Sequence, residues 1–236
     1  MAQGKKRKVV ICTPTVTRPY DAYLEAVEAS VPALEAAGLE HYMVSEVGNP
    51  YISAARSIML RKALDARADV VVFIDHDLSW RPDDLVRLIQ SDAHVVAGTY
   101  RFTLPDDRVE YMGSIATNPD GSVRVREDGL IYADMVPAGF LKVTKEAVAD
   151  LMADYPELVY GPVYSPSIDL FQHGAHKGMW WGEDYAFSRR WIESGHDLFI
   201  LPDLSLTHHR PGGSWPGNLH EHLMGLANGD RSNAGQ

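Results

Sequence analysis

The sequence contains one cysteine, Cys12, among its 236 residues. A single thiol cannot form a disulfide within the chain, so we expect a reducing compartment such as the cytoplasm. The sequence also lacks an apolar run near the roughly 20 residues that a membrane-spanning helix requires. Its N-terminal stretch, MAQGKKRKVVICTPT, has too few apolar residues for the core of a signal peptide. These absences predict a cytoplasmic protein without a membrane span.

Positive charge is scarce as well. The 22 Lys and Arg residues against 32 Asp and Glu residues give a formal net charge of −10. Broad binding to nucleic acid requires a positive surface, so the composition argues against that class of function. A local basic track is the remaining route to nucleic acid, and its candidates are Lys5 to Lys8, Arg101, Arg108, Arg124 and Arg126.

The first hundred residues alternate between short apolar runs and amphipathic stretches. Runs rich in β-branched residues predict strands at 8–15, 41–47, 69–75 and 94–100, and apolar residues at helical spacing predict helices at 19–37, 53–67 and 81–90. This alternation predicts an α/β fold with a Rossmann-like, mostly parallel central sheet flanked by helices. Ligands bind such sheets beyond the carboxyl ends of the strands, so the loops after residues 13, 47, 75 and 100 are expected to face one cleft.

The second half of the sequence has a less regular pattern. It predicts short strands within 109–136 with a turn at 118–121, helices at 144–154 and 182–195, and one or two strands within 197–209. The last residues, 226–236, are rich in small and polar side chains and are predicted to form a flexible tail.

Two carboxylates, Asp75 and Asp77, follow directly after the apolar run VVVFI at residues 70–74. A carboxylate beside a dry strand is costly unless it is paired or holds a cation. Two acids one residue apart can reach one hard divalent cation, and Mg²⁺ or Mn²⁺ is often completed by the phosphates of a substrate. The motif therefore predicts a metal site, and a surface turn with two acids is the structural alternative.

Two tryptophans, Trp180 and Trp181, precede Gly182, Glu183 and Asp184 at the start of a predicted helix. Aromatic faces stack on sugar rings, and a carboxylate can accept a hydroxyl proton as a general base. Acids in the first turn of a helix also complement the helix dipole, which is the purely structural alternative.

Two histidines, His208 and His209, end a predicted strand. Neutral histidine is a common metal ligand, and neighbouring residues of a strand point to opposite sides, so one of the two is expected to face a metal.

Two further histidine pairs, His173 with His176 and His220 with His222, lack the partners of a four-ligand zinc site. We interpret residues 171–181 as a mobile loop over the side of the site where a hydroxyl-bearing acceptor would bind, with an ordinary surface loop as the alternative.

The order of these motifs resembles metal-dependent glycosyltransferases of the GT-A fold, in the manner of family 2. The resemblance spans about residues 8–210 and is carried by the strand before D-x-D, the G-E-D sequence that opens a helix, and the later P-D-x-x-x-x-H sequence. It implies that Asp75, Asp77 and His208 bind Mn²⁺ or Mg²⁺, and that this cation holds the diphosphate of a nucleotide sugar. It also implies a single GT-A-like domain over 1–225, with a nucleotide-binding half at 1–100 and an acceptor half at 101–225.

The same resemblance assigns roles around the cation. Asp184 would be the base of an inverting transfer, with Glu183 beside it. The loop that meets the uridine would be Thr13, Pro14 and Thr15. The nucleotide would also contact Arg56, Asp75 and His76. On the sugar or acceptor side we expect Tyr100, Trp180, Trp181 and Gly182.

The implied activity is that of a hexosyltransferase-type enzyme that moves a sugar from a nucleotide sugar, with a UDP-sugar as the expected donor, to an acceptor hydroxyl. One alternative is a nucleotidyltransferase on a related α/β fold, but CTPTVTRPY after the first strand has no glycine for a phosphate loop. The other is a noncatalytic nucleotide-sugar-binding domain. The sequence leaves open whether the acceptor is a surface or lipid-linked glycan, a protein, a small molecule or a modified nucleobase of DNA.

Overall fold

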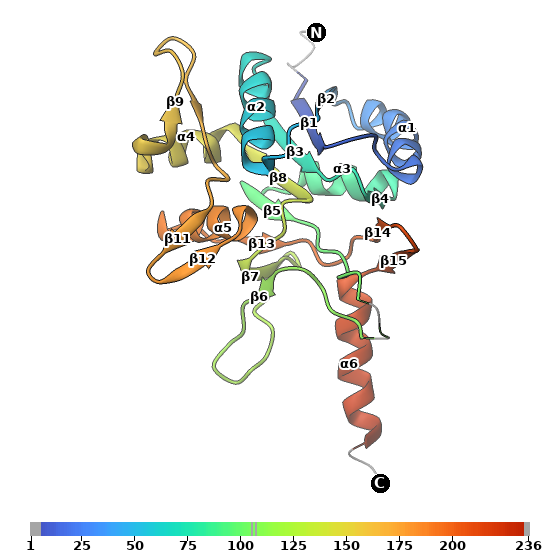
Figure 1. Cartoon of the computed structure of the whole chain (residues 1–236). Coiled ribbons are helices and arrows are strands. Elements are labelled where there is room, and N and C mark those ends of the chain that lie inside the picture. Colours follow the sequence, from blue (N-terminus) through green and yellow to red (C-terminus); the bar gives the residue numbers. More distant parts are fainter. Residues whose placement is uncertain (1–5, 105, 107, 234–236) are drawn as a thin grey trace, which may run out of the picture.

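An eight-stranded sheet runs through the centre of the molecule (Figure 1). The structure, a computed structural model, describes residues 6–104, 106 and 108–233. The strands of the sheet are β1 (Lys8–Thr15), β2 (Glu40–Val47), β3 (Val70–Ile74), β5 (Val95–Ala97), β6 (Ser114–Ile115), β7 (Ile131–Met135), β8 (Phe140–Thr144) and β13 (Phe199–Ile200). Across the sheet they lie in the order β2-β1-β3-β8-β5-β13-β7-β6.

Most strands of this sheet point in one direction. β1 is parallel to β2 and β3, and β5 is parallel to β13. β8 runs antiparallel to both β3 and β5, which makes those two strands parallel to each other. β7 is antiparallel to both β13 and β6, so β7 and β8 oppose the other six strands of the eight. The predicted α/β fold with a mostly parallel central sheet is therefore confirmed.

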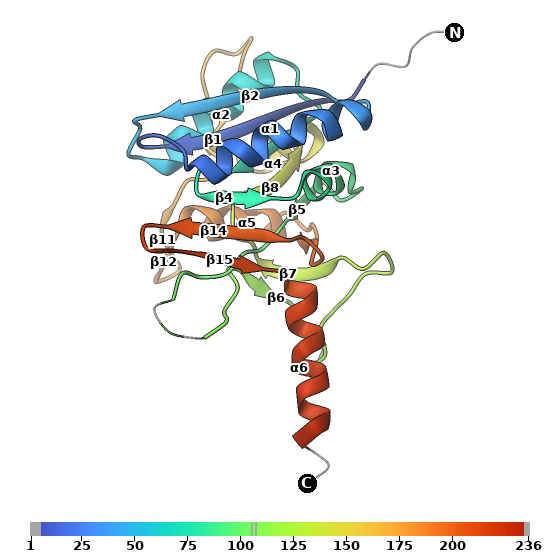
Figure 2. The same ribbon diagram turned by 90° about the vertical axis from the view of Figure 1, so that its right-hand side faces the viewer.

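Helices cover both faces of the sheet (Figure 2). One face packs against α1 (Asp21–Ala36) and α3 (Pro82–Gln90), and the other against α2 (Ile52–Asp65), α4 (Lys145–Asp154) and α5 (Glu183–Glu193). Residues of β1 alternate between the two cores, because Val9 and Ile11 join the first and Val10 and Cys12 join the second. A strand that is buried on both faces reads as a continuous apolar run, which is why the sequence predicts these strands so well.

The central strand β8 is the element that the sequence did not predict. Its run FLKVT is interrupted by Lys142, whose side chain is fully buried and whose Nζ donates to the carbonyl oxygens of Ser91 at 2.5 Å and Ala93 at 2.8 Å. Burial lowers the pKa of Lys142 to about 8. A chain segment from the second half thus completes the sheet between β3 and β5, and a charged residue inside it hides the strand pattern.

A smaller three-stranded sheet lies beside the carboxyl end of β3. It consists of β4 (Leu78–Trp80), β14 (Leu206–Arg210) and β15 (Gly213–Gly217), in the order β15-β14-β4. β14 pairs antiparallel with β4 so that His208 lies opposite Leu78, next to Asp77. This pairing joins two motifs that are more than a hundred residues apart in the chain.

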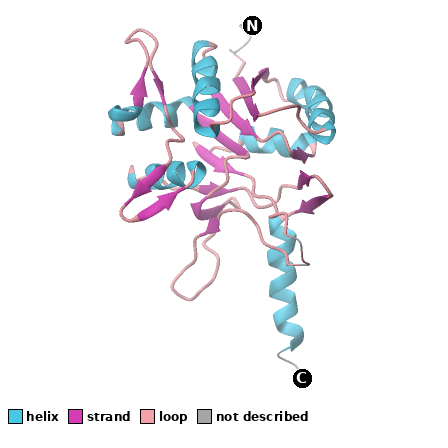
Figure 3. Cartoon of the chain, in the orientation of Figure 1, coloured by secondary structure: helices cyan, strands magenta, loops and turns pink. Residues whose placement is uncertain are grey.

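Two short hairpins project from the α2 and α5 side (Figure 3). They are formed by β9 (Val159–Tyr160) with β10 (Ser167–Ile168), which follow a short 3₁₀ helix (Pro156–Leu158), and by β11 (Gly174–His176) with β12 (Met179–Trp181). The second hairpin corrects the interpretation of residues 171–181 as a loop. Its turn has positive φ at Lys177 (49°) and Gly178 (81°), the pair of left-handed residues that a tight two-residue hairpin requires.

The chain ends in α6 (Leu219–Asn233), which extends away from the rest of the molecule (Figure 1). The predicted flexible tail, 226–236, begins inside this helix, and its residues 234–236 lie outside the described part of the chain. The helix starts on the core, because Leu219 is buried and Leu223 packs against the same cluster. Among the described residues, no helix has both the length and the apolar character needed to cross a bilayer.

Candidate functional site

A cavity of about 220 Å³ lies where the loops after β1, β2 and β3 meet the start of α5. Seven of its lining residues belong to the predicted site: Pro14, Thr15, Arg56, Asp75, His76, Asp77 and Glu183. The other five were not predicted: Val16, Asn49, Pro50, Ile52 and Arg210. Three of the four loops expected to share a cleft do so. A larger cavity, of about 510 Å³, lies between β4, β14 and the start of α6, and none of the predicted site residues lines it.

A buried arginine holds this cavity together. The side chain of Arg56, on α2, is only 2% exposed. Its Nη2 lies 2.9 Å from Oδ1 of Asp75, and its Nη1 lies 2.9 Å from Oε1 of Glu183. Burial alone would lower the pKa of Arg56, but the charges of the two carboxylates outweigh burial and raise it. The arginine expected to approach a nucleotide thus joins the D-x-D loop to the first turn of α5.

The second acid of D-x-D lies in a different environment. The side chain of Asp77 is 7% exposed, and its Oδ2 lies 3.4 Å from Nε2 of His208 and 3.1 Å from Nη1 of Arg210. Burial alone would raise the pKa of Asp77, but His208, Arg210 and His76 together lower it. Asp77 is therefore the ionised centre of a small cluster.

The two histidines of β14 point apart, as the alternation of a strand predicts. His208 is buried and faces Asp77, whereas His209 bonds through Nε2 to the hydroxyl of Ser79 and through Nδ1 to the hydroxyl of Ser214. His208 is thus the histidine of the pair that faces Asp77, and the expectation that it faces a metal stays a prediction.

The donor atoms of this cluster fit a hard divalent cation. Nδ1 of His208 lies 2.9 Å from the carbonyl oxygen of Arg101. Because a carbonyl can only accept, Nδ1 carries a hydrogen, and Nε2 is the ring atom that faces Asp77 Oδ2. A divalent cation shared by these two atoms would stabilise the arrangement, since Mg²⁺ and Mn²⁺ prefer carboxylate oxygen and imidazole nitrogen is a common metal ligand.

The first D-x-D acid does not complete a three-residue cluster. Within the described ranges, no group of three or more His, Cys, Asp or Glu side chains is arranged to hold a metal ion. Asp75 instead gives Oδ1 to Arg56. A cation here would take Asp77 and His208 directly, with its other positions left to a phosphate-bearing ligand and water, the usual pattern for Mg²⁺.

Asp184 has the properties of a base. Burial, followed by the nearby charge of Glu183, raises its pKa from an ordinary 3.8 to about 6, although the N–H of Tyr185 donates to its Oδ1 at 2.8 Å. Glu183 lies next to it but is paired with Arg56. Of the two acids, Asp184 is therefore the one whose carboxylate is not paired with the guanidinium of Arg56.

Two residues expected to touch ligand lie beneath the site instead. Thr13 is buried, and its hydroxyl bonds to that of Tyr23, so it does not line the cavity. Tyr100 is also buried and packs edge-on against the ring of His208, with ring centres 5.1 Å apart. Both residues support the floor of the site.

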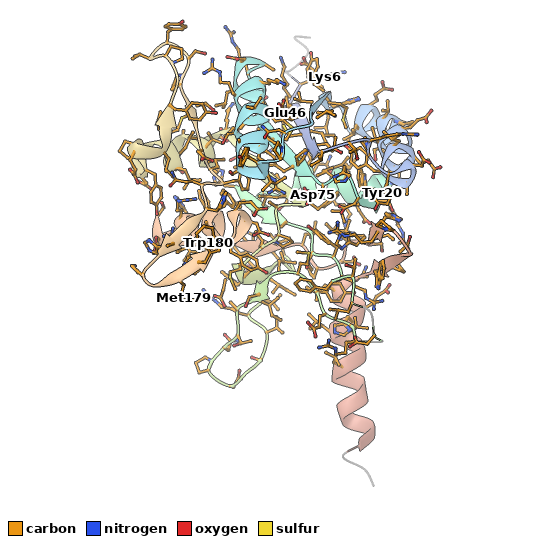
Figure 4. All side chains as sticks on the ribbon, in the orientation of Figure 1. Lys6, Tyr20, Glu46, Asp75, Met179 and Trp180 are labelled. Atoms are coloured by element: carbon orange, nitrogen blue, oxygen red, sulfur yellow. The ribbon has the colours of Figure 1, made fainter. Side chains whose placement is uncertain are left out.

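The aromatic residues before α5 lie on the β11–β12 hairpin. Trp180 is 73% exposed, and Figure 4 shows it beside Met179 at the edge of the molecule, with Asp75 near the centre. Trp181 is half-buried under the guanidinium of Arg189, 5.5 Å from the ring centre. Gly182 is the N-cap residue of α5. The hairpin thus presents one free aromatic face.

Part of the candidate basic track for nucleic acid is paired with acids or packed on a ring. Arg108 pairs with Asp106 and Glu110, and Arg126 pairs with Asp92 and Asp128, while Arg124 lies over the ring of Tyr132. Lys5 lies outside the described residues. These pairs weaken the case for a nucleic-acid acceptor.

Two residues of the site carried no clear signal in the sequence. Arg210 follows His208 by two positions and shares its ion cluster, which only the register of β14 reveals. Gly139 precedes β8, and its carbonyl accepts from the N–H of Asp75 at 2.9 Å. A Cβ at Gly139 would lie 2.2 Å from Oη of Tyr100 and 2.7 Å from Oδ2 of Asp75. The chain approaches Asp75 too closely there for any side chain.

Comparisons with known proteins bear on the fold. No family model matches the chain, and no curated protein matches it. Among solved structures, A197 from STIV is similar at 13% identity with a TM-score of 0.51, over 89% of this chain and 94% of that one. A Drosophila β-1,4-galactosyltransferase 7, solved with manganese, UDP-Gal and xylobiose, is similar at 14% identity with a TM-score of 0.47, over 82% of this chain and 64% of that one.

S. aureus TarS is similar at 12% identity with a TM-score of 0.44, over 83% of this chain and 58% of that one. At these identities the likeness concerns the fold alone. The fold is α/β, with strands of both halves of the chain in one sheet and with the D-x-D sequence at the carboxyl end of β3.

The close approach at Gly139 yields a stability prediction. Gly139→Ala is expected to lower the free energy of unfolding by about 1–3 kcal/mol, the usual range for overpacking, because Tyr100 and Asp75 must move. Gly225→Ala, inside α6, is the control and should not lower stability, since a Cβ there meets nothing within 4 Å and alanine favours a helix over glycine. Thermal unfolding measures both. Equal melting temperatures for wild type and Gly139→Ala would show that Asp75 is free to shift.

Proposed function

We propose that the chain is a metal-dependent glycosyltransferase that moves a hexose from a UDP-sugar to an acceptor hydroxyl with inversion. The observation that carries the proposal is the buried bridge from Asp75 through Arg56 to Glu183. It joins the cavity of about 220 Å³, which Asp75 and Asp77 line, to the helix turn that carries Asp184, a carboxylate whose pKa is raised to about 6. A binding site alone has no need for such a base.

The donor would occupy the cavity between the D-x-D loop and the loops after β1 and β2. A divalent cation held by Asp77 and His208 would neutralise the charge that develops on the departing diphosphate. Pro14, Thr15 and Pro50 also line the cavity and would enclose the nucleoside. Asp75, fixed by Arg56, would orient the rest of the D-x-D loop.

Asp184 would accept the proton of the acceptor hydroxyl. At neutral pH a carboxylate with a pKa of about 6 is mostly ionised, and it is a stronger base than an ordinary aspartate. Glu183 is less suited to this role because Arg56 holds its Oε1. The exposed face of Trp180 on the neighbouring hairpin would stack on a sugar acceptor.

The first test is metal-dependent nucleotide binding. UDP is expected to bind at least about 10-fold more tightly with Mn²⁺ than with EDTA, because the acids repel a diphosphate unless a cation lies between them. His208→Ala should remove most of this dependence, and His209→Ala should preserve it, since His209 faces Ser79 and Ser214. Calorimetry with Mn²⁺ and with EDTA measures these affinities for the wild type and for both variants. Equal affinity of the wild type with and without Mn²⁺ would contradict the metal site.

The second test separates a catalyst from a binder. A screen of UDP-sugars for Mn²⁺-dependent hydrolysis or transfer identifies the donor. Asp184→Asn keeps the shape of the side chain and is expected to reduce turnover by about 100-fold or more, with UDP and Mn²⁺ binding unchanged. Glu183→Gln is the matched comparison and should also weaken the Arg56 bridge, lowering stability. Near wild-type turnover by Asp184→Asn would place the base elsewhere.

The third test is the pH dependence of kcat/KM. Asp184 must be ionised to accept a proton, and its pKa is about 6, so the rate should be level above pH 7 and fall about 10-fold per unit well below pH 6. The UDP affinity, measured with Mn²⁺ at each pH, separates this loss from weaker donor binding. A level profile down to pH 5 would argue against Asp184 as the base.

A further inference from the structure

Arg210 forms an ion pair with the oxygen of Asp77 that would bind a divalent cation. Its Nη1 lies 3.1 Å from Oδ2 of Asp77, the same oxygen that faces Nε2 of His208. Residues two apart on a strand share a face, which is why Arg210 and His208 of β14 reach one carboxylate. The carboxylate is buried, whereas the side chain of Arg210 is 50% exposed. The arginine can therefore leave Asp77 without breaking the core.

Arg210 also lines the cavity proposed for the donor. Arg56 is the other arginine in that lining, and both of its amino groups are held by carboxylates inside the protein. Arg210 is thus the arginine of the lining with freedom to move. A guanidinium can form two parallel hydrogen bonds to a phosphate, which makes it well suited to a diphosphate.

We propose that Arg210 couples cation binding to diphosphate binding at this site. Without ligands, Arg210 neutralises Asp77. When Oδ2 of Asp77 is given to a cation, the guanidinium moves to the diphosphate of the donor, so that each ligand favours the other. The inference rests on the proposed function, and it adds that Arg210 opposes binding of the cation alone and assists binding of the cation with the nucleotide.

The scheme follows from charge balance at a buried carboxylate. Removal of Arg210 from Asp77 is unfavourable unless Asp77 finds a new partner, because a buried charge left unpaired is strongly destabilising, whereas the half-exposed guanidinium of Arg210 can turn to water. The cation supplies a partner for Asp77 but none for Arg210. The diphosphate supplies the partner for Arg210. Coupling between two ligands is reciprocal, so the effect must appear in the affinity of each.

The experiment compares wild type with Arg210→Gln, Arg210→Lys and Arg108→Gln. Arg108 is the control, because it is an exposed arginine paired with acids outside the cavity. Electron paramagnetic resonance of free Mn²⁺ gives the affinity for the cation alone, and calorimetry gives the affinity for UDP at saturating Mn²⁺. Thermal unfolding checks that each variant is folded.

Two changes of opposite sign are expected. Arg210→Gln should bind Mn²⁺ alone about 3- to 10-fold more tightly, since Asp77 no longer has a competing partner, and should bind UDP with Mn²⁺ about 10-fold more weakly, on the scale of one charged hydrogen bond. Arg210→Lys should lie between Arg210→Gln and wild type, because it keeps the charge but loses the two-pronged geometry. Arg108→Gln should match wild type.

Other outcomes distinguish failure of the coupling role of Arg210 from failure of the proposed function. If the wild type binds UDP in a Mn²⁺-dependent manner but Arg210→Gln changes neither affinity, or weakens both, the coupling role of Arg210 is overturned and the proposed function stands. If the wild type shows no Mn²⁺-dependent UDP binding, the proposed function is overturned and the coupling with it.

Discussion

The buried guanidinium of Arg56 is the interaction on which the geometry of the site depends. A cation with 2% exposure cannot remain in the core without partners, and its partners are Asp75 from the end of β3 and Glu183 from the start of α5. These acids are 108 residues apart in the sequence, 183 less 75. The need to neutralise one buried charge therefore fixes the position of the D-x-D loop relative to the helix that carries Asp184.

The same bridge separates the roles of neighbouring acids. In D-x-D, Asp75 is committed to Arg56, while Asp77 turns to His208 and Arg210. In E-D, Glu183 is committed to Arg56, while Asp184 keeps a raised pKa near 6 because it is partly buried without a direct cationic partner. Each motif thus contributes one acid that Arg56 holds and one that it does not. This division follows from packing and charge balance rather than from residue type.

The fold supplies the positions from which these side chains act. Parallel strands bring the loops after β1, β2 and β3 to one edge of the sheet, as in other doubly wound sheets. The antiparallel insertion of β8 brings Gly139 against Asp75, and the pairing of β14 with β4 brings His208 and Arg210 against Asp77. Segments from the second half of the chain thereby complete a site whose framework is built by the first half.

The sequence by itself determined the α/β class and the alternation of the first hundred residues, with element ends within three residues of those observed. It also determined that Asp75 and Asp77 follow a buried strand and that His208 and His209 point to opposite sides of theirs, because two-residue and 3.6-residue periods are local properties. Only the tertiary structure decided that Lys142 lies in a central strand, that Thr13 and Tyr100 support the site from below, and that Arg56 and Arg210 each hold one acid of D-x-D. Those outcomes depend on which distant segments pair and which charges must be neutralised inside the core. The spacing of neighbouring residues determines neither the pairing nor the neutralisation.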